Sequence, residues 1–82
     1  MVIKYNGHSI EIKKNQLTGK ETVCYDGKEV SSKFSIGGAT HVFSIDEENQ
    51  SIQYEVEINL RWHGLSGSTT VRRNGQIIFT DR

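Results

Sequence analysis

The chain has 82 residues, and its ten basic and ten acidic side chains give a formal net charge of zero. This length predicts a single β domain over residues 1–82, and the balanced charge excludes a nucleic-acid or membrane partner recruited by bulk electrostatics. One cysteine excludes an internal disulfide. We see no apolar run of membrane-spanning length and no export signal, so we expect a cytoplasmic protein.

The first predicted hairpin turns at Asn6-Gly7, a dipeptide that accepts positive φ at a two-residue turn. A turn of this length pairs Tyr5 with His8 and Ile3 with Ile10. One face of the hairpin then collects the apolar residues while lysine, serine and glutamate share the other. The agreement between turn and pattern supports this register.

A second hairpin is predicted at Asp26-Gly27. The same reasoning pairs Val23 with Val30 and places Tyr25, Phe34 and Ile36 on their face. Cys24 falls on the opposite face, across from Glu29. Gly37-Gly38 then separates this hairpin from the next predicted strand, 39–45.

The strongest pattern in the chain is the strict alternation of apolar and polar residues over 51–62. This period of two predicts a strand with one buried face and one face in water, and therefore antiparallel pairing. Across the acidic turn at 46–50, Ile45 pairs with Ile52. Phe43 then pairs with Tyr54, and His41 with Val56.

The last predicted hairpin surrounds Asn74-Gly75. A two-residue turn there would separate Val71 from Ile77 and Phe79. We therefore predict a three-residue loop, Arg73-Asn74-Gly75, which brings these three apolar residues onto one face and turns Ile78 outward.

These elements predict an all-β fold, a single antiparallel β-sandwich or flattened barrel of about eight strands in a meander. No strong internal repeat is visible in the sequence. The chain lacks proline, so lysines on the outer strands are expected to protect the sheet edges. Nearly every apolar residue is needed for the core, which leaves few to line a deep pocket. We therefore expect no enzyme activity and no cofactor.

Scattered matches between His8 and Phe34 resemble a known family. His8-Ser9-Ile10-Glu11, Thr18-Gly19-Lys20, 23–29 and Lys33, with a later match at 54–59, are similar to the repeated β domain of the Fas apoptotic inhibitory molecule family. The resemblance implies an antiparallel β-sandwich without catalytic machinery that acts through protein contacts. It also implies a link to apoptosis resistance and to suppression of aggregation, but it carries over no functional residue.

Two histidines and the cysteine are the first candidates for chemistry. His8 and His41 both project from apolar strand faces, and a metal-linked enzyme using them is one alternative function. No third ligand stands at a metal-like spacing, so we expect a histidine at the sheet margin, hydrogen-bonded to backbone. Cys24 faces a carboxylate, which disfavours a reactive thiolate and predicts a semi-exposed structural thiol.

Two glutamates on the wet face of the long strand, Glu55 and Glu57, are spaced as a pair of catalytic carboxylates could be. An open strand face offers no pocket that would shift their pKa values. We therefore expect them to serve solubility and cross-strand ion pairs, for example with lysines or with Arg61 along the same face.

The remaining candidate is an arginine-rich patch. Arg61, Arg72 and Arg73 with Trp62 suggest either a protein-contact surface or a β-barrel that binds single-stranded nucleic acid. Trp62 has the parity of the buried face, and nearby acids would repel phosphates, so nucleic acid is the alternative rather than the main prediction. The main prediction is a non-catalytic β domain that acts through protein–protein contacts with an unknown partner. A homodimer formed through an edge strand or a wet sheet face is one option for that partner.

Overall fold

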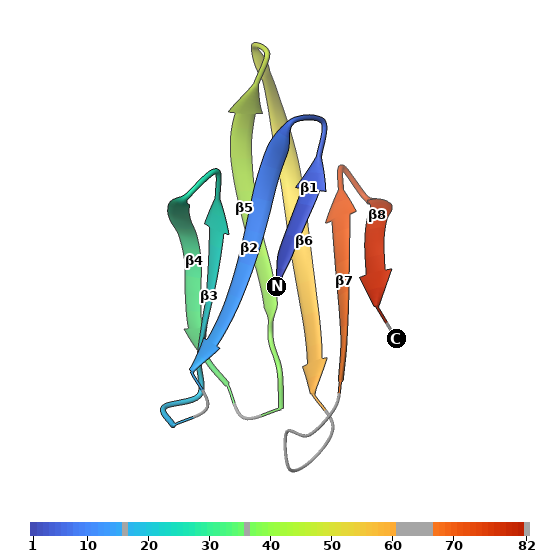
Figure 1. Ribbon diagram of the computed structural model, residues 1–82. Coiled ribbons are helices and arrows are strands. Elements are labelled where there is room, and N and C mark those ends of the chain that lie inside the picture. Colours follow the sequence, from blue (N-terminus) through green and yellow to red (C-terminus); the bar gives the residue numbers. More distant parts are fainter. Residues whose placement is uncertain (16, 36, 61–66, 82) are drawn as a thin grey trace. The chain divides into compact units, whose positions relative to one another are not determined.

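The computed structural model describes residues 1–15, 17–35, 37–60 and 67–81. These residues form eight antiparallel strands in two four-stranded sheets, and each sheet is a meander in chain order (Figure 1). The predicted all-β meander of about eight antiparallel strands is confirmed, as two sheets rather than one closed barrel. No helix that could span a membrane is found in this part of the chain.

The chain divides into two compact units, 1–36 and 37–82. Each unit contains one whole sheet, and the prediction of one domain over the full length stays a prediction. The strands of the first unit are β1 (Val2–Tyr5), β2 (His8–Asn15), β3 (Lys20–Tyr25) and β4 (Lys28–Phe34). Those of the second unit are β5 (Thr40–Glu47), β6 (Gln50–Leu60), β7 (Gly67–Arg73) and β8 (Gln76–Asp81).

Four hairpins use two-residue turns whose central residues have positive φ. The turn residues are Asn6-Gly7, Asp26-Gly27, Glu48-Asn49 and Asn74-Gly75. Turns of this hand match the right-handed twist of the strands that they join, which is why asparagine, aspartate and glycine dominate them. The three-residue loop predicted at 73–75 is therefore wrong, because Arg73 pairs directly with Gln76.

The first and third hairpins have the predicted registers. Tyr5 pairs with His8 and Ile3 with Ile10 in the first hairpin, while Ile45–Ile52, Phe43–Tyr54 and His41–Val56 are pairs in the third. The alternation along β6 is also confirmed, since Ile52, Tyr54, Val56 and Ile58 are buried. Trp62 and Ile36 lie outside the described residues.

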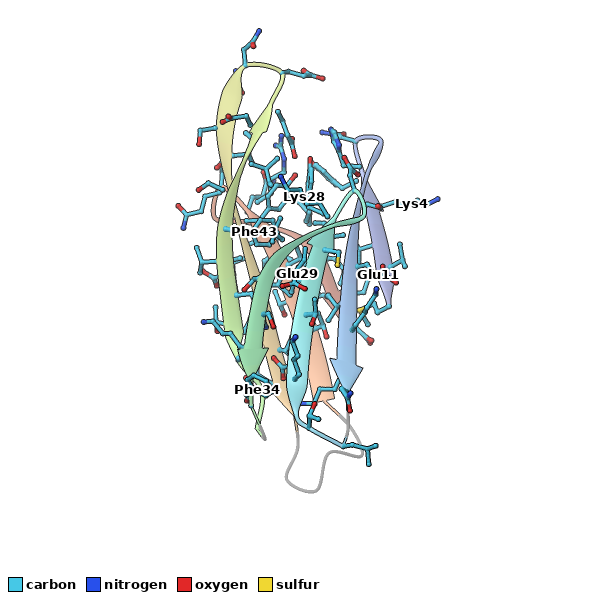
Figure 2. The ribbon with its side chains drawn as sticks, turned by 90° about the vertical axis from the view of Figure 1, so that its left-hand side faces the viewer. Lys4, Glu11, Lys28, Glu29, Phe34 and Phe43 are labelled. Carbon is cyan, nitrogen blue, oxygen red and sulfur yellow. The ribbon has the colours of Figure 1, made fainter. Side chains whose placement is uncertain are left out.

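A β-bulge changes the second hairpin. Val23 pairs with Ser31 and Cys24 with Glu29, so Val30 is an extra residue without its own partner. The predicted pairing of Val23 with Val30 is therefore wrong. Beyond a bulge the side chains of the strand change faces. Phe34, at the end of β4, consequently lies on the other face of the sheet from Val23, and it is 73% exposed (Figure 2).

The fourth hairpin contains the same irregularity. Val71 pairs with Phe79 and Arg72 with Ile77, which leaves Ile78 as the extra residue. Val71 and Phe79 share a face, as predicted. Ile77 lies on the other face with Arg72 and is 52% exposed, contrary to the prediction.

The two units are structural repeats, which the sequence did not indicate. The residue pairs of the two sheets correspond. Adding 40 to the residue numbers of β1, 44 to those of β2 and 48 to those of β3 and β4 turns the strand pairs of the first sheet into those of the second. The bulged residue Val30 becomes Ile78 in this alignment. Asp26 and Asn74 are equivalent as well. The side chain of Asp26 accepts a hydrogen bond from the Ser9 amide at 2.8 Å, and that of Asn74 accepts one from the Gln53 amide at 3.0 Å.

Candidate functional site

The predicted arginine patch is divided between two faces of β7. Arg72 and Arg73 are consecutive in the strand, so their side chains leave opposite faces of the sheet. Arg61 lies outside the described residues. One ligand approaching from one side of the sheet would therefore meet only one of these two guanidinium groups, and the nucleic-acid alternative stays a prediction.

Arg72 is paired with both glutamates of the wet face. Its Nη1 atom donates to Glu55 Oε2 and to Glu57 Oε1, each at 2.8 Å. The hydrogen bond to Glu57 is the main cause that raises the pKa of Arg72 above its ordinary value. The guanidinium therefore stays charged at physiological pH. The prediction that Glu55 and Glu57 make cross-strand ion pairs is confirmed, with Arg72 as the described partner.

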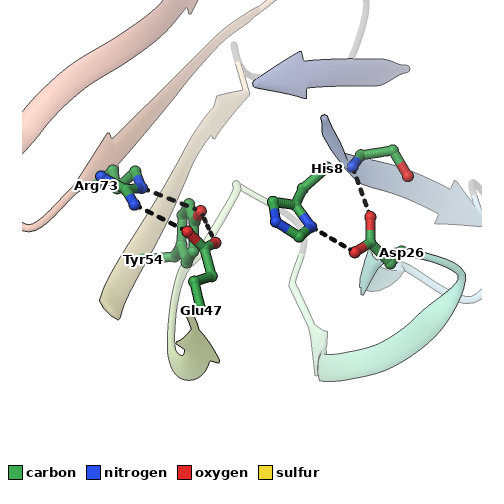
Figure 3. Close-up of polar contacts among 6 residues, drawn as sticks. His8, Asp26, Glu47, Tyr54 and Arg73 are labelled. Atoms are coloured by element: carbon green, nitrogen blue, oxygen red, sulfur yellow. Dashed lines mark hydrogen bonds and ion pairs between the residues drawn. The ribbon is translucent and has the colours of Figure 1, made fainter. Parts of the chain in front are cut away.

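Arg73 belongs to a more enclosed cluster that the sequence analysis missed. Its Nη2 atom donates to Glu47 Oε1 at 2.8 Å and its Nε atom donates to the Tyr54 hydroxyl at 3.3 Å. Tyr54 in turn donates to Glu47 Oε2 (Figure 3). Glu47 is 7% and Tyr54 1% exposed. The buried carboxylate of Glu47 is therefore satisfied within a cluster of three hydrogen bonds.

The contacts of the Glu47 cluster favour the charged form of Arg73. The hydrogen bonds to Glu47 and Tyr54 raise the pKa of Arg73 above its ordinary value. A raised pKa in a cationic group adds stability that is lost only when pH rises through that value. The pair therefore persists through the alkaline range. The sequence signal for Glu47 was its alternation with the polar positions of β5, because it lies on the same face as the buried residues His41 and Phe43.

A second buried carboxylate lies in the first unit. Glu21 is fully buried and forms a salt bridge with Lys14, whose Nζ atom lies 3.1 Å from Glu21 Oε2. Lys14 also donates to the carbonyl of Ser35 at 2.9 Å. Lys33 pairs with Glu21 on the other side in the strand register. Two flanking lysines offset the cost of burying this charge.

The two candidate histidines have different surroundings. His8 Nδ1 lies 2.7 Å from Asp26 Oδ2 (Figure 3). The imidazole ring also stacks on Tyr25, with centroids 5.2 Å apart. The hydrogen-bond partner of His8 is therefore a carboxylate, in addition to any backbone contact. His41 is fully buried on β5. The two residues belong to different units, and among the described residues no group of three potential metal ligands is present, so the metal-linked alternative stays a prediction.

Cys24 is opposite Glu29, as predicted, but the expectation of a semi-exposed thiol is wrong. The residue is 7% exposed and lies in a row with Glu11 on β2 and Glu29 on β4 (Figure 2). Burial of the side chain limits the access of other reactants to the thiol. The position therefore favours a structural thiol.

The sheet edges differ in how they are protected. β1 has only four residues and includes Lys4, and β4 combines the bulge at Val30 with Lys28 and Lys33. β8 contains the bulge at Ile78. Bulges, short length and charged side chains each discourage pairing with another chain.

β5 has none of these three features along its first six residues. Residues 40–45 read Thr-His-Val-Phe-Ser-Ile, and the register with β6 runs unbroken from Thr40 to Glu47. On the outward face, Val42 is 52% exposed and Ser44 is exposed. Among the described strands, β6 alone is hydrogen-bonded to β5. We call residues 40–47 the β5 edge, and it is the candidate functional site.

Comparison with known proteins adds no name to this site. No family model, curated protein or solved structure matches the chain.

Proposed function

We propose that the protein is a non-catalytic β domain that acts through protein–protein contacts, and that the β5 edge is its contact site. The observation that carries the proposal is an unbulged edge strand whose first six residues carry no charged side chain, whereas the other described edges carry protective features. Such an edge presents peptide groups to which a strand from another chain can bond, as in recognition by β-strand addition.

The ionisable side chains support a contact function over catalysis. Arg72 bonds to two glutamates, Arg73 to Glu47, and Lys14 to the buried Glu21. Groups held in such pairs stabilise the fold and are poorly placed to exchange protons with a substrate. The resemblance to the Fas apoptotic inhibitory molecule family is consistent with a contact role and stays a prediction.

Photo-crosslinking from a single position tests the proposal. A benzophenone amino acid introduced at Ser44 should produce protein adducts in a lysate from the host cell. The matched control is the same group at Ser32, an exposed serine on the protected edge strand β4. We expect several-fold more adduct from position 44. Equal yields from the two positions, or none from position 44, would contradict the proposal.

A further inference from the structure

The hydrogen bonds of β5 determine which of its peptide groups are open. The Ile58 amide donates to the Ala39 carbonyl at 2.9 Å, so this pair belongs to the bonded pairs of the β5–β6 ladder. Bonded and non-bonded pairs alternate along an antiparallel ladder. The peptide groups of Val42, Ser44 and Asp46 therefore point away from β6, towards the open edge.

We infer that a second copy of this chain binds there, with the two β5 strands antiparallel about a twofold axis at Ser44. The inference rests on the proposed function and names its partner. In this register the Ser44 residues of the two copies exchange both peptide hydrogen bonds. Val42 lies opposite the partner's Asp46, and on the buried face Phe43 lies opposite the partner's Ile45.

This register is selected by the length of the overlap between the two strands and by the faces on which their side chains lie. A twofold axis through a residue keeps each face of one sheet continuous with the same face of the other. Centred at Ser44, the two strands overlap over 41–47 of the β5 edge, seven of its eight residues. Centred at Val42, they overlap only over 40–44. The Ser44 register therefore forms more pairs and matches Phe43 with a smaller apolar side chain.

Electrostatics permits two identical edges to meet. The charged residues of the β5 edge are Asp46 and Glu47, and Glu47 is already buried in its bond to Arg73. In the proposed register the two Asp46 residues are four positions apart, or about 13 Å along the strands. This exceeds the screening length of about 8 Å at physiological ionic strength. A chain with zero net charge also has no long-range self-repulsion.

Sedimentation of the purified protein tests the self-association. The wild type is expected to show a concentration-dependent dimer. Ser44→Lys places two like charges opposite each other and should weaken the dimer at least tenfold. Gln53→Lys is the matched control, because Gln53 is exposed and pairs with Ser44 one strand further in. This control should retain the dimer within about twofold.

A proline at the same position separates lost pairing from added charge. The Ser44 amide faces the open edge, so Ser44→Pro removes no bond of the β5–β6 ladder, and proline is tolerated at such edge positions. The variant should give a folded monomer by circular dichroism and sedimentation. A Ser44→Pro protein that folds and dimerises like the wild type would overturn the inference.

Disulfide trapping tests the register itself. Bonded antiparallel pairs place their Cα atoms about 5.5 Å apart, within disulfide range, so Ser44→Cys should crosslink rapidly under mild oxidation. Val42→Cys is the control, since its sulfurs would be about 13 Å apart along the strands in this register. The parent protein, whose only cysteine is buried, should remain uncrosslinked. Faster trapping at position 42 than at 44 would overturn the Ser44 register.

The two proposals fail in different ways. A wild type that sediments as a monomer at high micromolar concentration overturns the inference of a second copy. Adducts of a different protein at position 44 would leave the contact function standing in that case. Absence of any position-specific adduct would remove the contact function as well.

Discussion

The units over 1–36 and 37–82 have the same strand plan but different side-chain chemistry. Both are four-stranded meanders with equivalent registers and a bulge at the same place. Both have an Asx side chain that joins the second turn to the neighbouring strand, from Asp26 in one unit and Asn74 in the other. All six lysines of the chain are in the first unit and all four arginines in the second.

The difference extends to the buried charges. Glu21 of the first unit is buried with Lys14, whereas the equivalent positions in the second unit are Thr69 and Ile58. Glu47 of the second unit is buried with Arg73, and it belongs to an extension of the β5–β6 hairpin that the first unit lacks. Backbone register and turn chemistry therefore define this fold, while the location of buried charge is free to vary.

The largest effect is expected where the second unit begins. Gly38 has a φ of +108°, and a Cβ atom there would lie 2.1 Å from the carbonyl oxygen of Ile58 on β6. Backbone would have to move, so Gly38→Ala should lower the free energy of unfolding by about 3 kcal/mol. Thermal or denaturant unfolding measures this loss.

The neighbouring glycine is the control for this prediction. A Cβ atom at Gly37 meets no atom within 4 Å, so Gly37→Ala should change stability by less than about 1 kcal/mol. Equal losses from the two variants would show that the close approach of Gly38 to β6 does not limit the fold.

An intermediate loss of stability is expected when the buried ion pair of the first unit, Glu21 with Lys14, is replaced by the equivalent residues of the second unit. Glu21→Thr installs the residue found at Thr69 and leaves Lys14 without its buried partner. We expect a loss of about 2 kcal/mol, because removal of one member of a buried pair is costly. Adding Lys14→Ile, the residue found at Ile58, should recover part of this loss. A double-mutant cycle in denaturant measures the coupling, and additive losses would contradict it.

The smallest effect is expected at the equivalent Asx residues. Asp26→Asn retains an oxygen for the Ser9 amide, as Asn74 does for Gln53, and loses only the charge beside His8. The cost should be below about 1 kcal/mol, whereas Asp26→Ala, which removes the acceptor, should cost about 1 to 2 kcal/mol. Comparable losses from both substitutions would mean that the ion pair with His8, rather than the shared Asx bond, stabilises the turn.

Sequence reasoning predicted the strands and most hairpins because local signals determine them. Asn6-Gly7 and the alternation along β6 each specify a turn or a face without reference to distant residues. The bulges at Val30 and Ile78 were missed because one added residue reverses all later side chains without a distinctive local signal. The repeat was missed because its offset changes from 40 to 44 to 48 along the chain, which hides it from a search at one spacing.

The candidate site was only partly predictable. The sequence indicated an edge strand and a second copy as possible features of a contact protein, but which strand lacks protection depends on where the bulges lie. The pairing of Arg73 with Glu47 requires knowing that β5 and β6 extend two residues beyond Ile45 and Ile52. Charged residues at 46–50 instead suggested a solvated turn.

The bulge at Val30 has a consequence for variation in chain length. A deletion of that one residue would restore simple alternation to β4 and keep the pairs beyond it, so Phe34 would stay opposite Lys20 and Lys33 opposite Glu21. The edge would lose its irregularity but keep the positive charges of Lys28 and Lys33. Loss of a single codon would thus leave charge alone to keep this border of the first sheet from pairing. A second pairing edge on the same molecule would give open-ended polymers in place of closed pairs.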